Sequence, residues 1–528
     1  MRAAAGGWVA LVRLSLRTAR LRLVLWPVGI AVLVGATASS MTTIAASAAQ
    51  RAAYATAALS TAGLAFNGRG YGLDTVGGIT ANKLSFLVTL LLPLVAVHLA
   101  VHLTRRQEAD GLVELVTARA VGRLAPLAAA VVVMCGVVLL AGAGSAVGLV
   151  VAGLPAGGST WYAAGLMGTM AMGAGLGFCA AQVARDGRGA QELGVAVLGA
   201  LFLVRALVDV RDWPATWLTP GGWLNEVRAF GDARWWPLVA LLGCGVVLTG
   251  AAVVLNARRD LGAGLISPSA GAPAAGARLA TPLGLMVRLT RGSALGWAIG
   301  AAVWGFTVGV LSHQVGGLFR ANPDLAARLG PLGARVELVM AAVGASYLGL
   351  VASALLALEL SRVATEELQG RTGVVLATAV GRRAVWFRWL CVAVVWVLLL
   401  QVVSGLALGI GVAVGGGSAS DAFSGPGWVL AFAPAVLVLG AVSACVVAVA
   451  PRPGIAAAWG LFGAVIVIAV LGEVLDLPWW ISGLSPFKHV GAVPAESVQW
   501  AWLGGMLAVA GILGGVSGLL FSRRDLTA

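Results

Sequence analysis

The sequence predicts an all-α integral membrane protein with twelve transmembrane helices, arranged as two parallel six-helix repeats. Of its 528 residues, 59% are hydrophobic and only 11% are charged, whereas soluble proteins carry about 25% charged residues. Apolar stretches of about 18 residues or more recur, each long enough to cross the hydrocarbon core of a bilayer as a helix. A polar pattern also occurs twice in this apolar chain, which indicates an internal duplication.

The first half holds six predicted spans. Its first apolar run follows a basic segment and so resembles a signal peptide. We interpret the run as a retained helix, because it is of spanning length and Val12-Arg13-Leu14 recurs as Val287-Arg288-Leu289. The segments 8–17 and 283–291 fit amphipathic elbow helices in the headgroup layer, one before each half's first helix, and an extended basic flank is the alternative. The spans lie near 21–43, 84–104, 124–152, 161–184, 190–210 and 236–257.

The segment 258–285 is rich in Ala, Gly, Pro and Ser, which is typical of a linker. It separates a first half at 1–257 from a second half at 286–528. Because each half has an even number of helices, the halves should share one orientation about a pseudo-twofold axis along the membrane normal. The spans of the second half lie near 294–316, 337–360, 384–414, 426–450, 455–477 and 500–522.

The distribution of arginine predicts a multi-pass protein of the bacterial plasma membrane with both termini cytoplasmic. Most of the 35 basic residues lie at the termini, in the linker and in alternate loops, and such positive segments are typical of the cytoplasmic side. The net charge of +14 therefore reflects topology in contact with membrane lipids, and no nucleic-acid partner is expected.

The duplicated polar pattern, called the cassette here, lies between the second and third helices of each half. Glu108, Gly111 and Arg123 recur as Glu367, Gly370 and Arg382, in each case 259 residues later. Acidic residues lead and arginines close each copy, which suits a short cytoplasmic helix that docks into a dimeric soluble partner. A duplicated, solvated connector is the alternative. The candidate docking residues are Glu108, Asp110, Gly111, Glu114, Arg123, Glu366, Glu367, Gly370, Arg371 and Arg382.

A second duplication gives each half a basic end after its sixth helix. Arg258-Arg259-Asp260 recurs as Arg523-Arg524-Asp525. Glycine pairs four residues apart also recur and fit small-xxx-small helix packing, although a chain with 74 glycines should contain such pairs by chance. They include Gly173/Gly177, Gly411/Gly415, Gly511/Gly515 and Gly514/Gly518.

No pattern for catalysis, a metal or a cofactor is evident in this chain. A P-loop needs a lysine after glycine, and the only lysines, Lys83 and Lys488, stand elsewhere. His98 and His102 share one helix face, a spacing that could bind a metal or relay protons, but without a third ligand nearby a structural or interfacial role is expected. Glu359 is an acid within a span, placed where it should reach the interface.

The first cassette carries a family resemblance. Gln107-Glu108-Ala109-Asp110-Gly111-Leu112-Val113-Glu114-Leu115, followed by Val121-Gly122-Arg123, resembles the Glu-Glu-x-x-Gly-Arg-x-Glu-Leu…Val-Gly-Arg signature of ABC-2-type exporter permeases. It is most similar to the duplicated, twelve-helix actinobacterial members associated with export of antibiotics and other hydrophobic compounds. The resemblance implies a non-enzymatic permease subunit that moves hydrophobic or amphipathic, drug-like substrates outward.

The resemblance further implies a homodimeric ABC ATPase partner that holds ATP and Mg, with the two cassettes as coupling helices. Gln107 departs from the signature, since an acid is expected there. Gly373 stands where the first copy has Glu114, and Arg371 where it has Leu112. The two docking surfaces should therefore be unequal.

Two rival functions predict other residues. A proton-coupled secondary transporter of the major-facilitator type also has twelve helices in two parallel halves. It should carry Gly-x-x-x-Asp-Arg-x-Gly-Arg-Arg in a short loop between helices two and three, and the cassette lacks that pattern. An intramembrane transferase should show an acidic pair at an outer loop, where Asp74 stands nearly alone.

Overall fold

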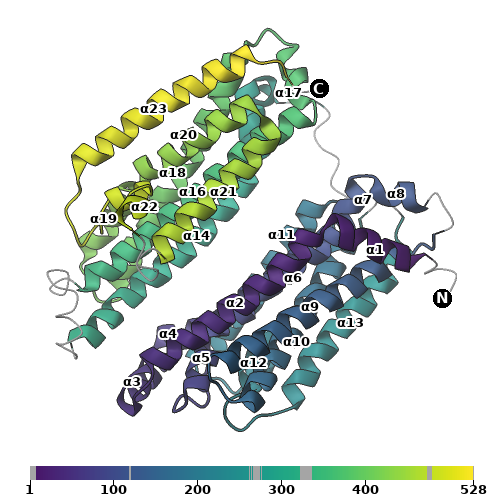
Figure 1. Cartoon of the computed structure of the whole chain (residues 1–528), viewed down its shortest axis with the longest axis vertical. Helices are drawn as coiled ribbons and strands as arrows, with labels where there is room; N and C mark the ends of the chain where they lie inside the picture. Colours follow the sequence, from purple (N-terminus) through teal and green to yellow (C-terminus); the bar gives the residue numbers. More distant parts are fainter. Residues whose placement is uncertain are drawn as a thin grey trace. The chain divides into compact units, whose positions relative to one another are not determined.

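The computed structural model describes residues 7–117, 121–260, 262, 264–265, 274, 276–320, 336–471 and 478–526. These residues form helices and connections without a strand, and include twelve helices long and apolar enough to cross a membrane. The chain divides into two compact units, residues 1–271 and 272–528 (Figure 1), with the boundary inside the predicted linker. The all-α prediction with twelve spans is confirmed.

The first unit has six spanning helices, preceded by the separate amphipathic helix α1 (Trp8–Thr18). The second spanning helix has 34 residues and is continuous. Two π-helical turns within it divide it into five segments. Short helices cover the outer connections: α3 (Ala48–Ala58), α4 (Thr61–Asn67), η3 (Thr216–Leu218) and α12 (Pro220–Glu226). The spans are α2 (Arg20–Ile44), the composite α5 (Val76–Phe86), η1 (Leu87–Leu91), α6 (Leu92–Val101), η2 (His102–Arg106) and α7 (Gln107–Ala109), then α9 (Ala125–Val151), α10 (Ala156–Val183), α11 (Gly187–Val210) and α13 (Trp236–Arg258).

The second unit repeats this order with different details. Its fourth span is divided into α19 and α20, and its outer connection carries α22 (Trp479–Ser482) and η6 (Pro486–His489). The short η4 (Ala277–Ala280) precedes the first span. The spans are α14 (Pro282–Arg320), α16 (Val336–Leu368), α18 (Arg382–Val414), α19 (Ala419–Leu430) with α20 (Ala433–Val449), α21 (Pro451–Leu471) and α23 (Trp500–Arg523).

The two predicted elbows differ in the structure. In the first unit, Ala19 has φ −108° and ψ 10°, which ends α1 and starts α2 in a new direction. In the second unit, residues 283–291 are instead the first turns of the 39-residue α14. The prediction of a separate second elbow is therefore wrong, because no residue with a non-helical backbone separates this segment from the span.

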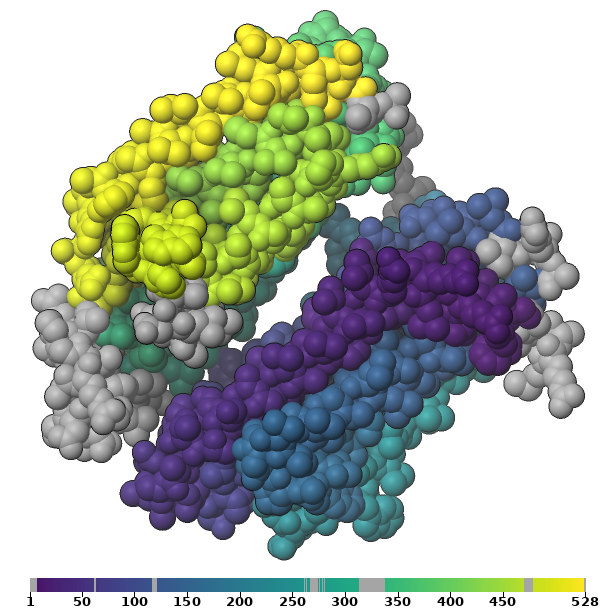
Figure 2. All heavy atoms as spheres, viewed as in Figure 1, coloured from purple at the N-terminus to yellow at the C-terminus, as the bar shows by residue number. Residues whose placement is uncertain are grey.

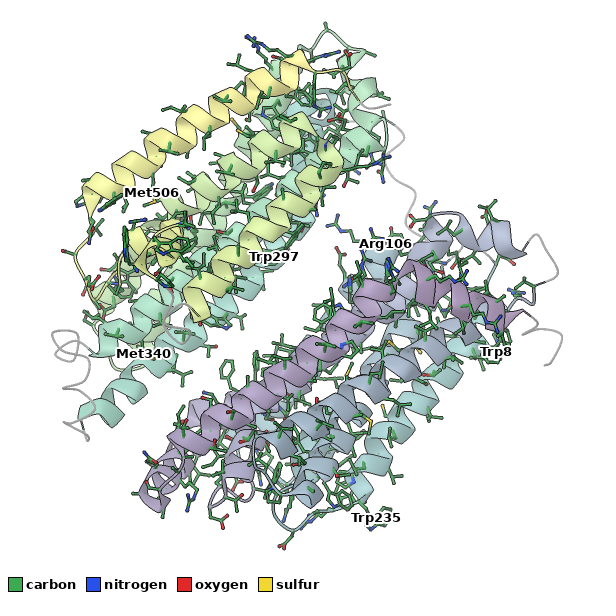
Figure 3. All side chains as sticks on the ribbon, in the orientation of Figure 1. Trp8, Arg106, Trp235, Trp297, Met340 and Met506 are labelled. Carbon is green, nitrogen blue, oxygen red and sulfur yellow. The ribbon has the colours of Figure 1, made fainter. Side chains whose placement is uncertain are left out.

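The opposite ends of the first unit differ in chemistry. Figure 3 shows Trp8 and Arg106 at one end and Trp235 at the other. We call the end with the cassette and the sixth-helix arginines the basic end of a unit. At the other end, Arg205 of α11 donates hydrogen bonds to the carbonyl groups of Ala65 and Phe66 (2.6 and 2.8 Å) and pairs with Asp209. This buried pair attaches the fifth span to α4.

The least buried spans are the two sixth helices and the fifth helix of the second unit. The buried share of the most apolar 18-residue window is 17% in α13 and in α21 and 22% in α23, and it is 28% in α2, α11 and α14. Figure 2 shows α2 and α23 uncovered along their length on this face. By contrast, 72% of that window is buried in α10, which forms the centre of the first unit's core.

Some of the glycine pairs are helix contacts. A Cβ on Gly173 would lie 2.7 Å from Cα of Pro93, and one on Gly177 would lie 2.9 Å from Cα of Val97. A Cβ on Gly411 of α18 would collide with the carbonyl oxygen of Phe306 in α14. Gly511, Gly514 and Gly515, in contrast, have open space. The chance interpretation is therefore wrong for Gly173/Gly177 and Gly411/Gly415.

We expect Gly411→Leu to destabilise the second unit, because a side chain against a backbone carbonyl forces two helices apart at a cost of about 1–3 kcal/mol or more. Thermal unfolding of the purified protein, followed by tryptophan fluorescence, measures this. Gly511→Leu adds the same side chain within a similar glycine pair and should leave the transition unchanged. Equal shifts for both variants would contradict the assigned helix contact.

Candidate coupling site

The two cassettes share one backbone turn. The second helix of each unit ends at a glycine with a left-handed backbone, Gly111 with φ 73° and Gly370 with φ 74°. No atom lies within 4 Å of a Cβ built on either. Glycine is therefore required for its conformation, since side chains disfavour positive φ. The turn leads into a short helix, α8 (Leu112–Thr117) or α17 (Arg371–Leu376).

In the first unit, Glu108 is the centre of a buried ionic cluster. Arg259, at the end of the sixth helix, donates from Nη1 and Nη2 to the two carboxylate oxygens, each at 2.7 Å. The backbone N–H of Gly262 donates at 2.7 Å, and Nη1 of Arg105 lies 2.8 Å from Oε2. We call Glu108 with Arg259 the first clamp.

Neighbouring helices orient Arg259 in the first clamp. Its Nε donates to Oε1 of Gln182 at 2.6 Å, and Nδ2 of Asn256 donates to the same oxygen at 3.1 Å. Arg123, which closes the cassette, donates to the backbone carbonyl of Arg259. The start of the third helix and the end of the fourth therefore both contact Arg259 at the end of the sixth.

The second unit has an equivalent arrangement. Arg524 donates from Nη1 and Nη2 to the carboxylate oxygens of Glu367, each at 2.5 Å, and we call this pair the second clamp. Nε of Arg524 donates to the backbone carbonyl of Ala448. Arg382 donates to the backbone carbonyl of Arg524 at 2.8 Å. The two duplications seen in the sequence thus bind each other in both units.

Both clamps are shielded from water. The exposed fractions of the side chains are 7% for Glu108 and 6% for Arg259, and 3% for Glu367 and 15% for Arg524. Two-pronged arginine–carboxylate bonds are strong and fix geometry. Removing one partner of a buried pair costs about 3–5 kcal/mol, because a charge stays buried without its countercharge.

The clamps are not identical. The residue 259 positions after Arg105 is Ala364, so the second clamp has no counterpart of that arginine. A side-chain oxygen of Gln182 holds the first clamp's arginine, whereas a main-chain oxygen of Ala448 holds the second's. The first clamp therefore includes a second arginine and a side-chain amide, at Arg105 and Gln182.

Other predicted residues lie outside the clamps. In the second cassette, Glu366 accepts two hydrogen bonds of 2.6 Å from Arg371, whose pKa is raised by this bonding. The remaining predicted residues lie exposed around the two clamps: Asp110, Glu114, Arg258, Asp260, Arg523 and Asp525. The structure therefore brings Glu108 to Arg259 and Glu367 to Arg524, and leaves the other charges at the surface.

Sequence reasoning missed the most exposed apolar side chains of the short helices. Leu115 of α8 is 72% exposed and Val374 of α17 is 73% exposed. They lie 259 residues apart and are therefore equivalent positions of the two cassettes. The sequence signal that could have identified them is an apolar residue at the same place in both polar cassettes. Val113 and Thr372, two residues earlier, are both buried, which orients each short helix with one face inward.

His98 and His102 contact side chains of neighbouring helices, and Glu359 lies near an arginine. No group of three or more potential metal-ligating side chains occurs in the described part of the chain. Nε2 of His102 lies 2.7 Å from Nη1 of Arg22, and Nδ1 of His98 lies 2.7 Å from Nε2 of Gln191. Glu359 is 1% exposed, 3.8 Å from Arg362. Its position in the sequence predicts that it reaches the interface, and the structure instead buries it within its unit.

We expect Glu367→Gln to lower the free energy of unfolding by about 3–5 kcal/mol, because it leaves the buried Arg524 guanidinium without a carboxylate. Thermal unfolding of the purified protein measures the loss. Glu366→Gln removes the neighbouring carboxylate from a pair whose arginine is 54% exposed, and should cost less than about 1 kcal/mol. Similar losses in the two variants would mean that the clamp does not stabilise the fold.

We expect Gly370→Ala to destabilise the second cassette by about 1–2 kcal/mol, because alanine disfavours the left-handed backbone. Gly373→Ala is the matched control within α17, since Gly373 also has open space around it but lies in a regular helix. Hydrogen exchange of the α17 amides, followed by mass spectrometry, should show faster opening only in the first variant. Equal exchange in both would contradict the requirement for glycine.

Comparison with known proteins places the chain in a family. Residues 279–522 match the model of the C-terminal domain of the multidrug efflux system permease Rv1217c. The chain is 33% identical, over 531 aligned residues, to the multidrug efflux system permease protein Rv1217c of Mycobacterium tuberculosis (strain ATCC 25618 / H37Rv). The match covers 98% of this chain and 95% of the relative, and does not favour the major-facilitator alternative. The chain therefore belongs to the family of multidrug efflux system permeases that Rv1217c represents.

Proposed function

We propose that this protein is the membrane subunit of an ABC exporter that moves hydrophobic or amphipathic, drug-like compounds out of the cell. A separate homodimeric ATPase, which holds ATP and Mg, would dock on α8 and α17 and supply the energy. The protein would lie in the bacterial plasma membrane with both termini and both basic ends in the cytoplasm. The family and the absence of a P-loop pattern in the sequence support this division of labour.

The observation that carries the docking proposal is the equivalent exposure of Leu115 and Val374. An apolar side chain more than 70% exposed at the same place in two copies suits insertion into a pocket on each subunit of a dimer. Buried apolar anchors supply much of the affinity of protein interfaces. Charged residues around them, such as Asp110 and Arg371, would form the polar rim.

The clamps would transmit force and would not touch the partner. The sequence predicts Glu108 and Glu367 as docking residues. Both are buried in hydrogen bonds to the arginine that follows the sixth helix, so they would support the docking helix without contacting the partner. The glycine turn joins each short helix to the second span, and Arg123 and Arg382 join the start of the third span to the sixth. A displacement of α8 or α17 would thus reach three spans together.

The two docking surfaces would respond unequally to identical ATPase subunits. The first short helix begins with the exposed Leu112, and the second with Arg371 bound to Glu366. Glu114 of α8 is replaced by Gly373 in α17. One surface is therefore more apolar and acidic, while the other is more polar and basic.

We expect Leu115→Asp with Val374→Asp to abolish co-purification with the ATPase, because a carboxylate in an apolar pocket loses its hydration without a partner. The measurement is the amount of ATPase retained on the tagged permease and its stimulated ATP hydrolysis. Trp235→Asp with Trp479→Asp alters two exposed apolar residues away from the basic ends and should leave both readouts unchanged. Retention of the ATPase by the first variant, with unchanged thermal unfolding, would rule out these anchors.

A further inference from the structure

A second basic site lies beside the first clamp, on a more exposed face of the second helix. Consecutive residues of a helix point in different directions, and here Arg105 is 1% exposed and bound to the clamp, whereas Arg106 is exposed. Arg106 is labelled in Figure 3 at the basic end of the first unit. Arg22, in the first turns of α2, is also exposed. Three spans contribute, because Gly187 at the start of α11 packs against Arg106.

The imidazoles orient Arg22 without neutralising it. An arginine can only donate hydrogen bonds, so the 2.7 Å contact between Nη1 of Arg22 and Nε2 of His102 requires that nitrogen to be unprotonated. The parallel ring of His98 lies 6.4 Å away between centroids and is held by Gln191. A carboxylate in this place would cancel the charge of Arg22. A neutral imidazole fixes its direction and leaves its full positive charge.

The charges around this site sum to an excess of positive charge. Arg22 and Arg106 lie within electrostatic range of both imidazoles, and Asp110 is within range of His102. On α11, Arg188 forms an ion pair with Glu192 at 2.8 Å and so contributes little. No acidic residue among those the structure describes forms an ion pair with Arg22 or Arg106.

We propose that Arg106 and Arg22, the latter held by His102, bind the phosphate of an anionic phospholipid headgroup. Both arginines stand within the terminal turns of spanning helices, where the chain leaves the hydrocarbon and meets the headgroup layer. Guanidinium groups bind phosphate oxygens through paired hydrogen bonds. The site is separate from α8 and α17, so it does not depend on the proposed ATPase.

The second unit lacks the chemistry of this site. At positions 259 residues after His98, His102 and Arg106 stand Ala357, Ser361 and Thr365. Ser361 accepts a hydrogen bond from the indole N–H of Trp459 at 3.1 Å, so an uncharged contact replaces the arginine–histidine pair. The lipid site therefore belongs to the first unit alone, and the second serves as its internal control.

Native mass spectrometry of the full chain, purified without any ATPase, tests this site. The probes are phosphatidylglycerol and phosphatidylcholine of identical acyl chains, with inorganic phosphate as a competitor. We expect Arg22→Gln with Arg106→Gln to weaken phosphatidylglycerol binding roughly 25-fold, since each arginine near a membrane surface contributes about fivefold. Arg288→Gln with Arg452→Gln removes two exposed arginines of the second unit that no imidazole orients in the described part of the chain, and should weaken phosphatidylglycerol binding clearly less than the first double variant does.

Three results would overturn the proposal. One is phosphatidylglycerol retained equally by the two double variants, and another is phosphatidylcholine bound as tightly as phosphatidylglycerol. The third is displacement of the lipid by millimolar inorganic phosphate, which would assign the arginines to a free anion. His102→Ala provides a further check, because it keeps both charges but releases Arg22, and it should weaken phosphatidylglycerol binding less than the double arginine variant does.

Discussion

Each unit of this permease depends on one buried ion pair between the second and sixth helices. The carboxylate of Glu108 or Glu367 lies at the end of a spanning helix, where water is largely excluded. It is stabilised there chiefly because an arginine that follows about 150 residues later in the chain donates to both of its oxygens. Removing a charge from water is costly unless it is paired and hydrogen-bonded. This pair therefore determines where the short helix, the third helix and the sixth helix meet.

The two units use this pair with different supporting residues. Arg105 and Gln182 strengthen the first clamp, whereas the main-chain carbonyl of Ala448 holds the arginine of the second. The same region of the first unit carries the lipid-binding arginines, whereas the second unit has Ser361 and Trp459 there. Duplication has thus preserved the mechanical connection and the exposed anchor of each short helix, while the surrounding charges have diverged. Such divergence suits a transporter whose two halves have separate tasks.

Much of the fold could be predicted from hydropathy, because a bilayer imposes length and composition on each span. The cassette could be located because its polar residues recur in an apolar chain. The clamps could not, since Glu108 and Arg259 lie 151 residues apart and hydropathy carries no information on such pairing. The sequence does not distinguish the roles of Gly111 and Gly411. Gly111 is needed for a positive φ, whereas Gly411 is needed because a neighbouring helix lies too close for a side chain. The second elbow was mispredicted because amphipathic character does not reveal where a helix bends.

The most direct test of this account is whether a short helix and its sixth helix move as one body during transport. Spin labels would be placed at Thr378, after α17, and at Asp525, after α23. Pulsed electron paramagnetic resonance would measure the distance between the two labels in the complex with the proposed ATPase. The account predicts that this distance stays constant between the nucleotide-free and ATP-bound states, while the distance from Thr378 to a label at Ala109 changes. A change between Thr378 and Asp525 on ATP binding would contradict the clamp as a rigid connection.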